Sequence, residues 1–372
     1  MRRRLLTVVG IAVTLAACSS GAGGGDGSTP SGSRGLLAPL TALAEAGSWR
    51  ARGDDAFEVW ICHVPADSTA AIYGGLPLRL PLTPNGVATI VNDRVPKYFG
   101  QLSHGQYHPT FTAGGEVTLG TADGPQSCVD AAVAGAGPDT RAVLVVADAE
   151  HAADQPGGFG SGGDPCLEQS PCPVAQSHRS AYVGASDFHP DWGDNPPMDL
   201  IEHEIGHTLG WVHSGTDDTG AYLSALDVMS NSAAPRETEP SRRDGPDTLA
   251  VNRLLAGWLP VDDVWVAPPA GGTVTLSPSS GVDGRRLAVI AIGDGSFVTI
   301  ELLTADGFDD HLPSDGFAVH EVTVVDGVLQ PIDPLVGLPP YTELLTPISA
   351  LTTGAWHIEV TGPSQLSIRK VA

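Results

Sequence analysis

Apolar residues recur along the chain in patterns that predict strands and helices in alternation. Residues 57–62 (FEVWIC) have a period of two, which is typical of a strand with one buried face. Residues 142–147 (AVLVVA) form a short continuous apolar run, as in a central strand, and residues 181–188 (AYVGASDF) predict another strand. Residues 87–102 follow a helical pattern. We therefore expect a mixed α+β layer structure that extends to about Pro260.

The pattern of apolar residues changes after Pro260 from mixed helical and strand periods to short strand-like segments. The segments GTVTLSP, RRLAVIAI, SFVTIELL, GFAVHEVTVV, AWHIEVTG and QLSIRKVA are short and β-branched, and turn residues separate them. We expect residues 51–260 to form one domain and residues 261–372 to form a β-rich, sandwich-like domain. A structural role for this second domain is favoured over a role as a binding module.

The N-terminus has the features of an export signal. Arg2–Arg4 precede the apolar run Leu5–Ala17, which is too short to span a bilayer permanently. Residues 1–17 are therefore interpreted as a signal peptide, with the Sec and twin-arginine routes both open. The sequence LAAC that ends at Cys18 resembles a bacterial lipobox, in which that cysteine receives lipid. Plain secretion is the alternative.

Residues 18–50 are expected to form a flexible tether after the lipidated cysteine, because their first half is rich in glycine and serine. Such a tether would hold a folded domain at the extracellular face of the bacterial cell membrane. The protein is then lipid-anchored, or secreted if Cys18 carries no lipid.

Composition excludes one class of partner. The formal net charge is −24, and Lys97 and Lys370 are the only two lysines. Duplex nucleic acid is bound by a surface rich in lysine and arginine, so nucleic acid is not expected as a partner. The 46 glycines and 31 prolines predict many turns.

The remaining cysteines suit an oxidising compartment. Cys62, Cys128, Cys166 and Cys172 allow three pairings. Cys166–Cys172 can close a short local loop, which leaves Cys62–Cys128, and we expect these two disulfides. A structural zinc site is less favoured because no C-x-x-C spacing occurs.

Residues 203–213 (HEIGHTLGWVH) carry the strongest chemical motif. On a helix, His203 and His207 lie within about 40° of each other, so both imidazoles can reach one metal ion. A left-handed residue at Gly210 would end the helix and turn His213 back towards that ion. Three histidines leave the fourth position of a catalytic zinc open. Glu204 is then placed as the general base that takes a proton from a zinc-activated water.

The start of this helix is also predicted. Asp194 and Asn195 precede Pro196 and Pro197, and proline is well tolerated in the first turn of a helix. We therefore expect the helix to begin at these prolines.

The pattern HExxHxxGxxH resembles the zinc-binding consensus of the metzincin metallopeptidases. The resemblance implies a mixed sheet over the active-site helix and a methionine-containing turn beneath the metal, for which Met229 in DVMS is the candidate. That side chain would form an apolar floor and would not be a ligand. The long interval to LAGWLP is most similar to gametolysin-like secreted peptidases, whereas Ser214 is what matrixins show. Asn231 stands where some metzincins carry a tyrosine, so no such role is assigned.

The sequence therefore predicts a cell-surface zinc metalloendopeptidase, a hydrolase that cleaves a protein or peptide substrate. The alternative is a catalytically silent lipoprotein of the same fold that acts as a binding or adhesion module. Calcium is a further candidate cofactor, since His151 with Asp148 and Asp154, and the segment 187–194 (DFHPDWGD), offer oxygen and nitrogen ligands.

Overall fold

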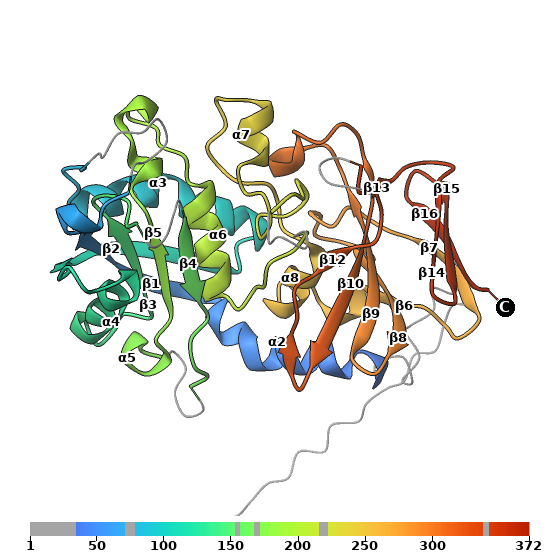
Figure 1. The fold of residues 1–372 in the computed structure, drawn as a ribbon. Helices are drawn as coiled ribbons and strands as arrows, with labels where there is room; N and C mark the ends of the chain where they lie inside the picture. Colours follow the sequence, from blue (N-terminus) through green and yellow to red (C-terminus); the bar gives the residue numbers. More distant parts are fainter. Residues whose placement is uncertain are drawn as a thin grey trace, which may run out of the picture.

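The computed structural model describes residues 35–70, 79–152, 157–166, 172–215, 222–337 and 342–371. Figure 1 shows an α/β part and a β-rich part side by side, with the C-terminus in the latter. The predicted signal peptide and Cys18 lie outside the described residues. The chain is mixed α+β, as expected. No described helix combines the length and apolar character needed to cross a bilayer.

The α/β part is built on a five-stranded sheet in the order β2-β1-β3-β5-β4. Its strands are β1 Gly53–His63, β2 Tyr107–Thr118, β3 Ala142–Ala147, β4 Gly158–Ser161 and β5 Ser180–Val183. The first four in this order run parallel, while β4 pairs antiparallel with β5 at one edge. The strands predicted at residues 57–62 and 142–147 are confirmed. The one predicted at 181–188 ends at Val183, and residues 186–188 form a 3-10 turn instead.

Helices cover both faces of this sheet because the strand residues alternate between two apolar clusters. Phe57, Val59 and Ile61 contact one cluster with α3 and α6, whereas Val143 and Val145 contact the other with α4. The helices here are α3 Pro84–Leu102, α4 Pro125–Gly135, α5 Val174–Ser177 and α6 Asp199–Thr208, followed by α7 Ala234–Thr238 and α8 Ala250–Leu255. The helix predicted at 87–102 is thus confirmed, and Thr83 caps it by accepting a hydrogen bond from the Gly86 N–H at 3.2 Å.

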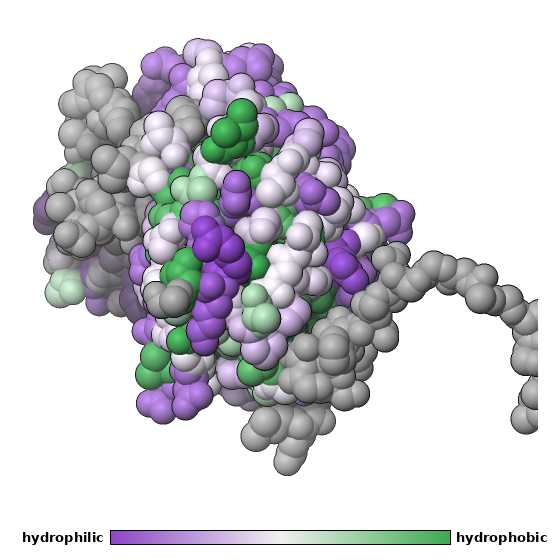
Figure 2. All heavy atoms as spheres, turned by 90° about the vertical axis from the view of Figure 1, so that its right-hand side faces the viewer, coloured by the Kyte–Doolittle hydropathy of each residue, from purple (hydrophilic) through white to green (hydrophobic). Residues whose placement is uncertain are grey.

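The β-rich part contains two sheets. One has the order β11-β10-β9-β8-β6, with β12 and β13 also paired to β10, and the other has the order β14-β15-β16-β7. The bounds are β6 Val264–Val266, β7 Gly271–Thr275, β8 Leu287–Gly293, β9 Ser296–Leu303, β10 Gly316–Val325, β11 Val328–Leu329, β12 Asp333–Pro334, β13 Leu344–Leu345, β14 Ala350–Thr353, β15 Trp356–Gly362 and β16 Gln365–Lys370. One apolar cluster takes side chains from both sheets. Figure 2 looks onto this side of the molecule, where polar and apolar residues are interspersed.

The tether predicted for residues 18–50 does not extend that far. Helix α2, Ala38–Gly47, lies within this stretch, and Leu37 and Leu40 are buried. Both leucines share an apolar cluster with residues of α8, β6, β8 and β9. Burial of these side chains orders the segment, since each fully buried leucine contributes roughly 1.5–3 kcal/mol. Figure 1 shows α2 running beneath both parts of the molecule.

Two disulfides are present, and both match the predicted pairing. Cys62 in β1 is joined to Cys128 in α4, which ties the sheet to the helix on its outer face. Cys166 is joined to Cys172 across a short loop.

Candidate metal centre

Helix α6 carries the histidine motif but begins later than predicted. It starts at Asp199, not at Pro196 or Pro197, because the Met198 N–H donates to the Arg243 carbonyl at 2.6 Å and holds the preceding chain outside the helix. At the other end Gly210 has φ +88°, which confirms the predicted left-handed turn. This turn directs the chain back towards the helix, as His213 requires.

The three predicted ligands do come together. The ligand atoms of His203, His207 and His213 all lie within 4.8 Å of one another. In the described part of the chain no other group of three metal-binding side chains is so closely spaced. Nitrogen atoms that share one tetrahedral zinc are about 3.4 Å apart, given bonds of about 2.1 Å. The spacing therefore suits a single ion with three nitrogen ligands.

Hydrogen bonds orient two of these rings. His203 Nδ1 lies 2.7 Å from the Val228 carbonyl, and His207 Nδ1 lies 2.9 Å from the Trp211 carbonyl. If each Nδ1 carries the proton, each Nε2 keeps its lone pair for a metal, which is the usual arrangement in histidine metal sites. The His207 and His213 Nε2 atoms face each other at 2.8 Å. With the His213 proton on Nε2, that atom donates a hydrogen bond to His207 Nε2.

Burial keeps these imidazoles neutral. It lowers the pKa of His203 to about 3, with a further contribution from the neighbouring His207. Burial also lowers the pKa of His213 to about 4, and lowers that of His207. Neutral imidazoles can bind a metal without first losing a proton. The cluster is therefore prepared for a cation at neutral pH.

Glu204 lies beside the first ligand in a nearly closed space. Its side chain is only 3% exposed, its Oε2 has no hydrogen-bond partner among the described residues, and burial raises its pKa to about 8. A Cβ atom at Gly158 would lie 2.7 Å from Glu204 Oε1, so only glycine lets β4 approach this carboxyl so closely. A buried carboxyl with a raised pKa next to a metal site is typical of a catalytic acid or base.

The DVMS turn lies under the helix, as the sequence predicts for Met229. Met229 is fully buried, and a side chain at Gly206, between His203 and His207, would collide with its Sδ. The preceding residue, Val228, accepts the hydrogen bond from His203. The turn therefore packs against the helix that carries the histidines.

Tyr222 is a site residue that the sequence did not reveal. Its hydroxyl lies 3.2 Å from His213 Nε2, although nothing in the spacing of the motif marks this position. Asn231, the position considered for a tyrosine, instead donates to the Glu237 carboxylate at 3.1 Å. A tyrosine therefore faces the cluster, but it comes from the segment before Met229.

A buried ion pair holds the end of the metal helix. Arg179, immediately before β5, donates to Asp55 of β1 at 2.8 and 3.0 Å and to the Thr208 carbonyl at 3.1 Å. Both charged side chains are nearly inaccessible, at 1% and 2% exposure. The last carbonyls of a helix need such donors. The sheet thus fixes the point at which α6 ends and the turn at Gly210 begins.

Among the described residues, the calcium ligands expected from the sequence do not form a group of three close enough to share one ion. Asp148 is taken up by hydrogen bonds from Arg79 and the Val64 N–H, and it also contacts His63. His151 lies 3.2 Å from the Asp123 carbonyl, and Asp154 lies outside the described residues. A carboxylate held by an arginine is a poor calcium ligand.

The sequence was compared with protein families and with curated proteins. No protein-family model matches the chain, and no curated protein is detectably similar to it.

Proposed function

We propose that the protein is a zinc-dependent metalloendopeptidase of the metzincin type, with His203, His207 and His213 as ligands. The observation that carries the proposal is one helix and its turn bringing three neutral imidazoles within 4.8 Å of one another, with the buried carboxyl of Glu204 beside them. This donor set suits zinc, which favours imidazole nitrogen.

A bound zinc ion supplies Lewis acidity, which polarises a carbonyl and lowers the pKa of water. Glu204 takes the proton of the attacking water at a carboxylate oxygen and passes it to the departing amine. Its nearly closed surroundings keep this carboxyl beside the ligands and away from bulk water. The Tyr222 hydroxyl donates a hydrogen bond to the carbonyl oxygen as negative charge develops on it.

Substrate binding is assigned to the edge of the sheet. Strand β4 is the last strand in its order and lies against α6, close to Glu204 and His207. An extended peptide can pair with such an edge through backbone hydrogen bonds. A peptide held in this way passes the metal site, which favours cleavage within a chain.

We place the protein at the extracellular face of the bacterial membrane, held there by lipid on Cys18 or else secreted. We assign the β-rich part a sandwich-like architecture and a structural role. A catalytically silent binding module is the competing proposal, and the same experiment decides between the two.

The test compares Glu204→Gln and His207→Ala with wild type in zinc content and in cleavage of an unfolded protein. Glutamine keeps the size of the side chain but cannot accept the proton, so hydrolysis should fall at least about a hundredfold with zinc retained. His207→Ala should lose zinc, whereas His108→Ala, an exposed position in β2, should keep both zinc and activity. Wild type without zinc-dependent cleavage, or Glu204→Gln as active as wild type, refutes the peptidase proposal.

A further inference from the structure

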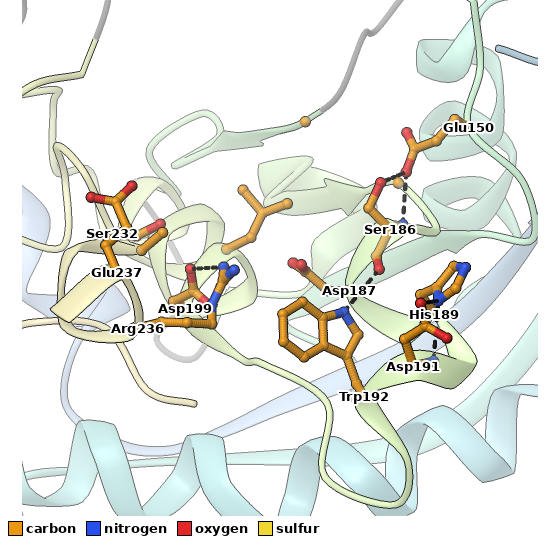
Figure 3. Close-up of a pocket in the computed structure, with 14 residues that line it drawn as sticks. Glu150, Ser186, Asp187, His189, Asp191, Trp192, Asp199, Ser232, Arg236 and Glu237 are labelled. Carbon is orange, nitrogen blue, oxygen red and sulfur yellow. Dashed lines mark hydrogen bonds and ion pairs between the residues drawn. The ribbon is translucent and has the colours of Figure 1, made fainter. Parts of the chain in front are cut away.

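A cavity of about 490 Å³ lies at the N-terminal end of the helix that carries the histidines, with Asp199 and Leu200 of α6 in its lining. Figure 3 shows its lining residues, which come from several segments around α6. Gly157 immediately precedes β4, Leu200 lies three residues before His203 in α6, and Ser232 lies three residues after Met229. The cavity is thus bounded by α6 and by residues that adjoin β4 and the DVMS turn along the chain.

Two buried carboxylate oxygens in this cavity have no hydrogen-bond partner among the described residues. One is Oδ2 of Asp187, whose side chain is only 9% exposed and points into the cavity between Trp192 and Asp199 (Figure 3). The other is Oε2 of Glu150, which is 2% exposed; its Oε1 accepts hydrogen bonds from the N–H and hydroxyl of Ser186. A buried carboxylate oxygen without a partner is costly, so each is suited to a donor that arrives with a ligand.

The cavity is short of positive charge. Its arginine, Arg236, is paired with Asp199 at 2.9 Å and lies 5.2 Å from the centre of the Trp192 ring. Because Arg236 is paired with Asp199, the carboxyl groups of Glu150 and Asp187 have no arginine partner among the described residues inside the cavity. The exposed carboxylates of Asp191 and Glu237 lie at its rim. Burial, followed by repulsion from Asp199, raises the pKa of Asp187 to about 8. A cationic ligand would reverse this shift and be held in return.

The shape of the lining favours an organic cation over a metal ion. In the described residues only the three histidines form a group of three metal-binding side chains within 4.8 Å, so the carboxylates of this cavity do not converge on one point. Leu200 and Trp192 add apolar wall to the acidic lining. Arginine and lysine side chains combine an apolar stem with a charged head that donates hydrogen bonds, which matches such a lining.

We propose that this cavity is the specificity pocket of the peptidase and receives an arginine or lysine side chain adjacent to the scissile bond. The inference rests on the proposed function, because the pocket acts on the substrate of that same site. The head group of the side chain is held by Asp187 and Glu150, and its stem lies against Leu200.

The first experiment maps the bonds that zinc-loaded wild type cleaves in a library of peptides. Arginine and lysine should be enriched at least about fivefold at one fixed position beside the cleaved bond. Asp187→Asn should abolish this enrichment. Asp54→Asn is the matched control, since it removes the same charge from an exposed position in β1 outside the cavity, and it should keep the enrichment. Cleavage without a basic preference overturns this inference but leaves the peptidase intact, whereas no cleavage at all counts against the proposed function.

A binding measurement gives a readout that is independent of turnover. Glu204→Gln should bind a peptide that contains arginine at the preferred position at least about tenfold more tightly than the same peptide with glutamine there. Adding Asp187→Asn should remove the difference, with folding checked by circular dichroism. Equal affinity for the two peptides refutes the pocket. A second result would also refute the pocket. If calcium chloride raises the melting temperature of wild type but not that of Asp187→Asn, the carboxylates hold a metal ion instead.

Discussion

Gly160→Ala tests whether the close approach of β4 to the metal helix is required. A Cβ atom at this position would lie 2.6 Å from the Cβ of His207 and would also collide with the backbone carbonyl of Glu204. Ordinary contact with a Cβ begins at 3.4 Å, and the closest atom, the Glu204 carbonyl oxygen, would lie at 2.4 Å, so strand and helix must separate by about 1.0 Å. Neither neighbour can rotate away, because one is backbone and the other is attached directly to it.

We expect this separation to cost about 1–3 kcal/mol of folding free energy, as other overpacked sites do. Because a displacement of about 1 Å can lower a reaction rate about a hundredfold, kcat/KM should fall about tenfold to a hundredfold. Urea denaturation and peptide hydrolysis measure the two effects. Gly100→Ala in α3 is the matched control: its added methyl meets nothing within 4 Å, so stability should rise by up to about 1 kcal/mol with activity unchanged. A Gly160→Ala protein with wild-type stability and activity would refute the reasoning.

Three further predictions concern other parts of the chain. Tyr222→Phe should lower kcat at least about tenfold with zinc content and KM unchanged, because only the hydroxyl donor is lost; unchanged kcat would remove Tyr222 from the mechanism. Burial raises the pKa of Glu301 to about 8, so the unfolded chain, with a pKa near 4.5, loses this proton first as pH rises. Wild type should therefore lose stability between about pH 4.5 and 8, and Glu301→Gln, which keeps an acceptor for the Ala250 N–H, should be the more stable protein at pH 8 but not at pH 4, as guanidinium denaturation would show. Cys18→Ser should leave the precursor unprocessed or release protein into the medium, and unchanged mass and membrane partitioning would favour plain secretion.

The sequence by itself predicted what short-range geometry controls. The helical period places His203 and His207 on one face, and Gly210 permits the turn that returns His213, whatever the rest of the chain does. The strands at residues 57–62 and 142–147 follow from local alternation and from a continuous apolar run. The Cys166–Cys172 loop was predictable because its two ends are close along the chain.

Only the tertiary structure decided what depends on contacts between distant segments. Arg179 meets Asp55 across 124 positions, and no local pattern marks either as the support of the metal helix. Helix α2 is ordered by apolar residues more than two hundred positions away. The Gly/Ser-rich residues before it suggested a tether because these distant contacts leave no mark on the local sequence. Tyr222 lies beside His213, and Asp187 lines the cavity from a 3-10 turn, although neither position follows a periodic pattern. Such positions are selected by three-dimensional packing, which a one-dimensional pattern does not record.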